Sequence, residues 1–590
     1  MSGFLCTPAA YLLVAVFFVI ALGAYAALGL HGAIAMRARG WIPRELSLLA
    51  AFGIAAVIAY ALFWLYLWKP AVGRISSLGA LLMAGAAYLD AGAWRRVRAA
   101  WDDPDIRTPL LLTGLIGLLY IALTYAWVFP RQSCAATDEA FVVDRILGTG
   151  SPDYLIQKIW ADGLYHGRPP WNYMLDPDLS RTTVADRPPL LGSMALLLYP
   201  LLPESLRFLG FMAATTAASL AWLAALWALL RCAGTPIART ALAVLAVSQT
   251  YYFWHSSIFT WPKALSGAFA VGAIVLLLRP AIHSVPNRPA VTLVAAVLAA
   301  LSVLGHFSAA LLLLVTALLL LHPRLFPGRR TSVAAGAVFL FIGGSYFLLK
   351  STMETNLSNQ TKYTLSVPDT SPVEPAEYKG LSTIEAVKRA YGKITLREAI
   401  GNKLYNLGSI FRPGCFLACP GESAKQGLWS SELLPILGSM KLLNFGWLLF
   451  LVPLVALFPP AAPWRRSLQC LEFSPEVRRA TLVYLAVAAA GLLVYGIASF
   501  RQGVSNILSS GFMLLLFAAV AARMFSLPYR WIWAFVAAPA AYFTALVYSM
   551  GLADRLHHNP PLLALLVVVV GAVLVLAARI LTAHQPPRHV

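Results

Sequence analysis

Long apolar runs separated by short polar segments dominate this chain of 590 residues. Runs of about 20 apolar residues, the length that a helix needs to cross a membrane, recur along the whole sequence. Only 12% of the residues are charged, well below the roughly 25% of a typical soluble domain. The pattern therefore predicts an all-α polytopic membrane protein with about 15 transmembrane helices and two large external loops.

Two apolar runs have lengths that do not fit a simple span. Ala290–Leu321 has about 32 residues and is interrupted only at Gly305-His306, so we expect two short spans with His306 at their junction. Leu190–Leu202, at about 13 residues, is too short to cross and predicts an interfacial or re-entrant helix. The other expected spans are Tyr11–Leu30, Leu46–Trp68, Leu78–Trp94, Pro109–Val128, Leu206–Leu230, Ala241–Trp254, Ala264–Leu278, Val333–Leu349, Leu442–Phe458, Thr481–Ser499, Ile507–Ala522, Trp531–Met550 and Leu562–Ala578.

Basic residues give the expected orientation. The net charge is +20, and arginines cluster in short segments between apolar runs, around residues 37–44, 95–98, 324–330 and 465–479. Such clusters mark cytoplasmic loops, which places the N-terminus and the segments Arg131–Pro203 and Lys350–Leu437 outside. This distribution argues against a nucleic-acid partner, since that would need basic residues gathered on one surface. The Ala-, Leu- and Arg-rich composition points to a bacterial inner membrane, with these segments in the periplasm.

Arg131–Pro203 is the first long polar segment between two blocks of apolar runs, and it contains Asp138-Glu139 near its start. Carboxylates at the mouth of a membrane helix are costly, which favours a function for them. A carboxylate accepts a proton from a hydroxyl group, whereas cations stabilise a phosphate leaving group. Basic candidates on the same expected face are His166, Arg187, His255, Lys263 and His306.

Each candidate also has a purely structural interpretation. Asp138 is suited to cap the helix that follows it, and Lys263 is long enough to extend to lipid headgroups. His306 on an apolar run is often a core histidine, and His166 fits an ordinary loop. Cys415 and Cys419 share one polar segment and form either a small disulfide or two thiols. The placement of acid and bases on one face favours the functional interpretation.

The order of these motifs resembles the GT-C superfamily of membrane glycosyltransferases that use polyprenyl-phosphate sugars. Asp138-Glu139 matches the acidic motif of their first external loop, and Arg187-Pro188-Pro189-Leu190 matches their Pro-Pro-Leu juxtamembrane helix. Gly305-His306-Phe307-Ser308 stands where these proteins often carry a Lys or His after a glycine. The resemblance covers residues 109–349, but four helices precede the first motif. In addition, Trp261-Pro262-Lys263 replaces an Asp-x-Asp motif.

The resemblance implies an inverting transfer of a sugar to an acceptor hydroxyl of a glycan or lipid at the outer leaflet. Asp138 would be the general base, with Glu139 as second choice. Arg187, Lys263 and His306 would bind the lipid phosphate, with His255 and His166 as further candidates. No cofactor is assigned, and a divalent metal stays open because the Asp-x-Asp motif is missing.

The expected parts are an accessory module (residues 1–108), a catalytic core that includes the loop 131–203 (109–350), an external segment with amphipathic helices (351–437) and C-terminal spans (438–590). Two alternatives stay open. A polymerase or ligase of lipid-linked glycans would also use residues of external loops, but it transfers whole oligosaccharides. A multi-spanning lipid or glycan transporter would instead show repeated halves and charges at the midplane.

Overall fold

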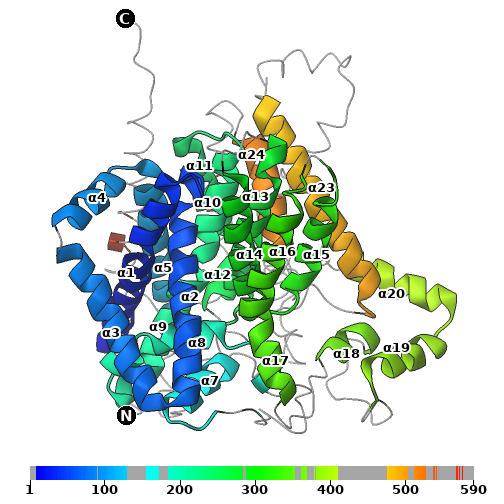
Figure 1. Cartoon of the computed structure of the whole chain (residues 1–590), viewed down its shortest axis with the longest axis horizontal. Helices are drawn as coiled ribbons and strands as arrows, with labels where there is room; N and C mark the ends of the chain where they lie inside the picture. The colour runs from blue at the N-terminus through cyan, green and yellow to red at the C-terminus, as the bar shows by residue number, and fades with distance from the viewer. Residues whose placement is uncertain are drawn as a thin grey trace, which may run out of the picture.

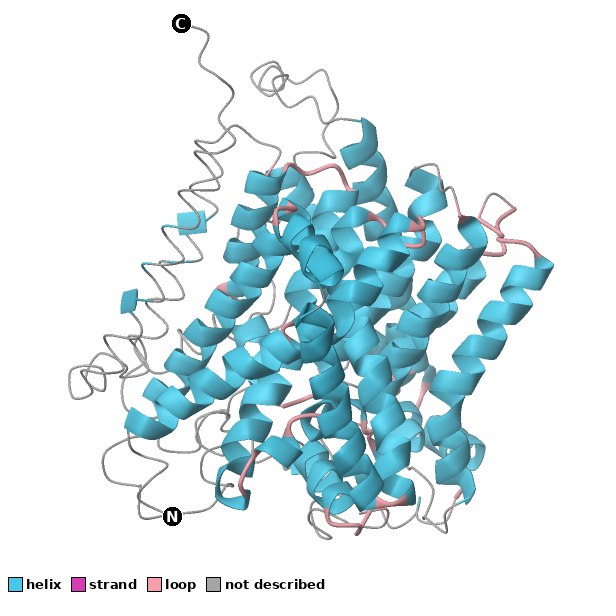
Figure 2. Ribbon diagram, turned by 60° about the vertical axis from the view of Figure 1, so that its left-hand side comes forward, coloured by secondary structure: helices cyan, strands magenta, loops and turns pink. Residues whose placement is uncertain are grey.

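The computed structural model describes residues 8–89, 91–128, 155–169, 171, 184–258, 260–282, 287–323, 325–352, 360–367, 378, 381–408, 475–501 and 511–525, together with seven isolated positions beyond residue 535. These residues are helical, with short connections gathered toward the two ends of the bundle (Figure 2). Nine helices in this part of the chain are long and apolar enough to cross a membrane. The chain is therefore a helical membrane protein, as the apolar runs predict.

The helices follow the expected runs closely in most places (Figure 1). Their bounds are α1 Pro8–Ala38, α2 Ser47–Trp68, α3 Pro70–Leu89, α4 Ala91–Trp101, α5 Pro104–Val128, α7 Leu155–Tyr165, α8 Leu190–Leu196, α9 Arg207–Ser219, α10 Ala221–Cys232, α11 Ile237–Ser248, α12 Tyr251–Ile258, α13 Lys263–Ile282, α14 Arg288–Gly305, α15 Ala309–Leu319, α16 Arg329–Phe339, α17 Ser345–Thr352, α18 Gln360–Ser366, α19 Thr383–Gly392, α20 Leu396–Gly408, α23 Pro475–Ala498 and α24 Phe512–Met524.

Two details differ from the expected spans. The third span begins at Pro70, because proline is suited to the first turn of a helix, and the arginines near residue 95 lie on α4. The run Ala241–Trp254 is divided between α11 and α12. The spans expected at Leu442–Phe458, Trp531–Met550 and Leu562–Ala578 lie wholly or largely outside the described residues, so the total of about 15 stays a prediction.

The run Ala290–Leu321 is divided as predicted. α14 ends at Gly305, His306 adopts an extended conformation (φ −156°, ψ 128°), and α15 begins at Ala309. The short run after Pro189 forms α8, whose residues Leu190–Leu196 are all buried. α8 packs against α2, α7 and α9, so it lies inside the bundle and not on its surface.

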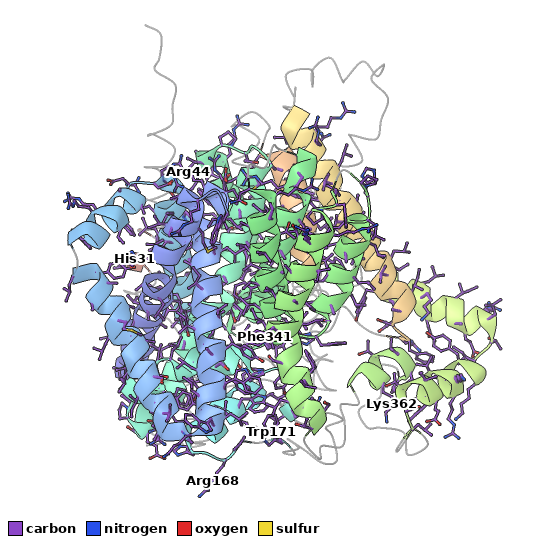
Figure 3. All side chains as sticks on the ribbon, in the orientation of Figure 1. His31, Arg44, Arg168, Trp171, Phe341 and Lys362 are labelled. Carbon is purple, nitrogen blue, oxygen red and sulfur yellow. The ribbon has the colours of Figure 1, made fainter. Side chains whose placement is uncertain are left out.

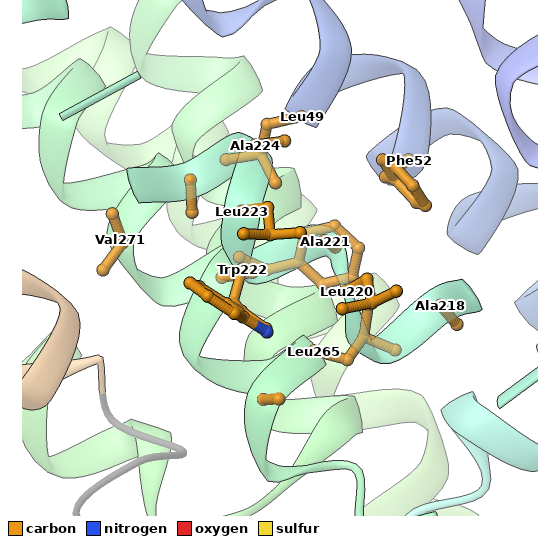
Figure 4. Packing of buried hydrophobic residues seen from close by; sticks show 14 of the residues in the cluster. Leu49, Phe52, Ala218, Leu220, Ala221, Trp222, Leu223, Ala224, Leu265 and Val271 are labelled. Atoms are coloured by element: carbon orange, nitrogen blue, oxygen red, sulfur yellow. The ribbon is translucent and has the colours of Figure 1, made fainter. Parts of the chain in front are cut away.

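The core of the bundle is built on α2, α10 and α13 (Figure 4). Trp222 of α10 is fully buried, and its ring stacks on Phe253 of α12 with 4.2 Å between centroids. The indole N–H of Trp222 donates to Ser257 Oγ at 2.9 Å, so its polar atom is satisfied inside the apolar core. The outer helices instead expose apolar side chains: Phe341, between α16 and α17, is 81% exposed, as expected for a surface that faces lipid (Figure 3).

One end of the bundle carries a buried charge network that the sequence does not suggest. Asp105 is fully buried and accepts hydrogen bonds from Trp227 Nε1 at 3.1 Å and Arg231 Nε at 2.8 Å. Asp103 pairs with Arg44 at 2.6 Å and with Arg37. These contacts join α1, α5, α10 and the segment before α2, so the arginines expected to mark orientation also hold helices together.

Candidate functional site

The His306 side chain lies at the junction of α14 and α15 and is 3% exposed. The backbone N–H of Ser308 donates to its Nδ1 at 3.3 Å, and Ser308 Oγ lies 2.8 Å from the same nitrogen. Since Nδ1 accepts a hydrogen bond, the neutral imidazole carries its hydrogen on Nε2. Nε2 is buried and has no hydrogen-bond partner among the described residues. A buried donor in this state is uncommon in folded proteins and indicates a ligand-binding position.

Lys263 begins α13 and is 4% exposed. Its Nζ lies 3.8 Å from the centroid of the Trp261 ring, a cation–π contact. Just before this pair, Thr260 has φ of +46°, a left-handed backbone conformation that is strained for a β-branched residue. Strain of this kind is concentrated at functional sites, where the surrounding structure holds it in place. The turn therefore fixes the direction from which Lys263 enters the bundle.

Lys263 and His306 come together because α13 and α14 pack unusually closely. A Cβ added at Gly305 would lie 2.9 Å from Ser266 Cβ and 3.1 Å from Ser266 Cα, so only glycine fits. Ser266 Oγ donates to the carbonyl of Ser302 at 2.7 Å. Ser266 lies one turn after Lys263, and Gly305 immediately precedes His306. The close contact between Ser266 and Gly305 therefore holds Lys263 and His306 at the same end of the two helices.

Arg187 is half-buried and lies in the short segment 184–189, which precedes α8. Three side chains hold the backbone of this segment. Trp160 Nε1 donates to the carbonyls of Val184 (3.2 Å) and Arg187 (3.0 Å), and Gln157 Nε2 donates to that of Pro188 (3.1 Å). Tyr346 of α17 donates to the carbonyl of Ala185 at 2.7 Å. The segment is thus anchored to α7 on one side and α17 on the other.

Burial and the positive charges of Arg187 and Lys263 hold the pKa of the His306 imidazole well below its usual value. His306 is therefore neutral at physiological pH and contributes a hydrogen-bond donor instead of a third charge. Two cations and a neutral N–H donor are groups of the kind that bind an oxyanion such as a phosphate. Within the described residues, no group of three or more His, Cys, Asp or Glu side chains lies close enough to hold a metal ion.

Of the remaining predicted site residues, only His166 has a described side chain. Asp138 and Glu139 lie outside the described residues, as do Cys415 and Cys419. His255 lies on α12, but its side chain is outside what the structure describes. His166 is exposed at the end of α7, where its Nε2 lies 3.4 Å from Arg207 Nη1. The structure therefore brings together three of the predicted phosphate-binding residues, Arg187, Lys263 and His306.

The residues that position this trio are mostly ones that sequence reasoning missed. Gln157, Trp160 and Tyr346 act through main-chain carbonyls, and no spacing in the sequence connects them with Arg187. Trp261 precedes Lys263 by two positions. This spacing was the one local feature of the sequence that could have indicated the contact between their side chains. Comparison of the chain with protein-family models, curated proteins and solved structures found no match.

Proposed function

We propose that this protein is a membrane glycosyltransferase that moves a sugar from a polyprenyl-phosphate donor to an acceptor hydroxyl of a glycan or lipid. The observation that carries the proposal is the convergence of Arg187, Lys263 and His306. These residues come from segments far apart in the chain, and sequence reasoning selected all three as phosphate ligands. The GT-C-like arrangement and the helices beyond those described belong to the same proposal.

The proposed reaction is a single inverting displacement. The acceptor oxygen forms a bond to the anomeric carbon on the face opposite the phosphate. The bond between the anomeric carbon and the phosphate oxygen breaks, and its electron pair leaves with the polyprenyl phosphate. The hydroxyl proton passes to the carboxylate of Asp138, with Glu139 as second choice.

The residues of the trio have separate roles in this step. Arg187 and Lys263 neutralise the negative charge that grows on the leaving phosphate, and this is the type of stabilisation that contributes most to group transfer. His306 donates its Nε2–H to a phosphate oxygen and, being neutral, leaves the total charge of the site unchanged. Because Ser308 and the α13–α14 contact fix the ring, the donor needs no rearrangement when charge develops.

The orientation belongs to the proposal as well. Arg44 lies near one end of the bundle, whereas Arg168, Trp171 and Lys362 lie near the other (Figure 3). With the arginine-rich loops in the cytoplasm, the second end faces the periplasm, and the protein resides in a bacterial inner membrane. Lys263 begins a span and His306 follows another, so both residues lie at helix ends, which is where the proposal places the lipid phosphate.

The proposal is tested with the purified full-length chain in liposomes. The liposomes contain a radiolabelled polyprenyl-phosphate sugar, and membranes from cells lacking this protein supply acceptors. We expect label to move to an acceptor and Asp138→Asn to abolish the transfer without changing the thermal unfolding midpoint. Asp102→Asn, an exposed carboxylate near α5, is the control and should retain transfer. Near-normal transfer by Asp138→Asn would exclude Asp138 as the base. Movement of the intact donor across the bilayer without transfer would instead favour the transporter.

A further inference from the structure

A second basic cluster surrounds the ring of Tyr165, the last residue of α7. The guanidinium carbon of Arg74 lies 4.2 Å from the ring centroid and that of Arg207 lies 4.4 Å from it. His166 follows Tyr165 in the chain, and its Nε2 lies 3.4 Å from Arg207 Nη1. We call Arg74, Tyr165, His166 and Arg207 the Tyr165 cluster. It draws on α3, α7 and α9, so the fold builds it from three separate helices.

The end of α7 is shaped to expose this cluster. Gly167 has φ of +72°, which favours glycine, and the N–H of Arg168 donates to the carbonyl of Gly163 at 2.7 Å. Arg74 Nη2 donates to the carbonyl of Tyr165 at 2.7 Å and so caps the helix. The chain therefore turns sharply after His166 and leaves one edge of the cluster open to solvent, where His166 is exposed.

The cluster contains hydrogen-bond donors that the described protein groups do not satisfy. Nε of Arg74 and Nε of Arg207 are both buried and have no hydrogen-bond partner among the described residues. Neither arginine forms an ion pair with a carboxylate in this part of the chain. Asp162, one turn before His166, is already bound to Lys158 at 2.7 Å and to Tyr199 at 3.0 Å. The guanidinium groups of Arg74 and Arg207, which both contact the Tyr165 ring, therefore keep hydrogen-bond donors available for an external anion.

The position of the cluster strengthens this argument. Arg168, two residues after His166, lies at the end of the bundle opposite Arg44 (Figure 3). Under the orientation proposed above, this end faces outside, where arginine is normally scarce in short loops. Helix capping accounts for one donor of Arg74 but for none of Arg207, whose guanidinium group lies against Tyr165 and His166. A ligand accounts for both.

We propose that the Tyr165 cluster binds a phosphate group, separately from the Arg187–Lys263–His306 trio. Arginine forks match the oxygen atoms of a phosphate in pairs, and their stacking on Tyr165 holds them ready. The phosphate belongs either to a lipid headgroup at the outer membrane surface or to a soluble phosphate. Both sources present the same oxygens to the two arginines. This inference does not depend on glycosyl transfer.

The test uses the purified full-length chain in a neutral detergent with two probes, short-chain phosphatidylglycerol and inorganic phosphate. Binding is measured by calorimetry for the natural protein, for Arg207→Gln and for Arg74→Gln/Arg207→Gln. We expect at least about tenfold weaker binding for Arg207→Gln, equivalent to about 1.4 kcal/mol, and a larger loss for the double variant. Arg207→Gln leaves the Arg74 cap intact, so it keeps the test valid if the double variant does not fold.

The matched control is Arg168→Gln, which removes one exposed positive charge from the same loop. It should bind both probes as the natural protein does. Loss of phosphatidylglycerol binding alone would assign the cluster to a lipid headgroup, and loss of both would assign it to phosphate from either source. Unchanged binding of both probes by Arg207→Gln, or an equal loss in Arg168→Gln, would overturn the proposal.

Discussion

The two nitrogens of His306 have different surroundings, and two substitutions test them separately. An asparagine places an acceptor near the position of Nδ1, so His306→Asn keeps the contact with the Ser308 N–H and removes the Nε2–H donor. A glutamine places an amide N–H near the position of Nε2, so His306→Gln keeps a donor and loses the Nδ1 acceptor. If Nε2–H binds phosphate, His306→Asn should be the more damaging change.

The size of the effect follows from the contacts of this one group. Nε2 is buried and has no protein partner among the described residues, so its removal breaks no contact within that part of the protein. A hydrogen bond to a charged group contributes about 1.5–3 kcal/mol. His306→Asn should therefore weaken binding of a polyprenyl phosphate by roughly 10- to 150-fold. His306→Gln should lose clearly less, because the amide donor reaches the same region.

The assay is equilibrium binding of a radiolabelled polyprenyl phosphate to the purified chain, with thermal unfolding measured in parallel. A larger loss in His306→Gln than in His306→Asn would show that the turn held by Ser308 matters and the donor does not. Equal affinity in both variants and the natural protein would place the phosphate elsewhere. Either result would refute the role assigned to Nε2.

Three further predictions concern stability and pH. Asp105→Asn should cost about 1–3 kcal/mol, since it weakens the hydrogen bonds that the buried carboxylate accepts from the partly buried Arg231 and from Trp227, and should lower the unfolding midpoint more than the exposed Asp102→Asn. Gly305→Ala should cost about 1–3 kcal/mol and weaken phosphate binding, because the added methyl meets α13 at 2.9 Å. Gly336→Ala, where nothing lies within 4 Å, should not do so. Because the pKa of His306 is lowered in the folded chain, the unfolded chain binds the proton more readily below about pH 6.5. The free energy of unfolding should therefore decrease as the pH is lowered below that value, and the decrease should be smaller in His306→Asn; equal slopes would contradict this reasoning.

The sequence predicted those parts of the fold that depend on local length and composition. Apolar runs located the spans, and one polar interruption correctly divided Ala290–Leu321 at His306. The start of the third span at Pro70 was missed, because Gly73 and Arg74 lower the apolar character of a turn that is nonetheless helical. Hydropathy does not locate such helix starts, because it depends on composition and not on backbone geometry.

The meeting of Lys263 and His306 could be predicted from the order of the helices. Lys263 and His306 lie beside apolar runs that must cross in opposite directions, so their meeting at one end follows from topology. The partners of Asp103 and Asp105 could not be predicted, since a polar loop between two helices looks the same whether its carboxylates face water or arginine. His166 was expected with the phosphate ligands, but the end of α7 places it beside Arg207. Such differences arise from packing between distant helices, which periodicity does not encode.

The glycine contact between α13 and α14 determines which parts of the bundle are able to move. Separating these helices would break the bond from Ser266 to the Ser302 carbonyl and open a gap where two backbones touch. The segment that carries Arg187 is held by side-chain hydrogen bonds, each worth about 1 kcal/mol, and by burial of Val184 and Ala185. Lys263 and His306 therefore keep their positions relative to each other when other parts of the bundle move.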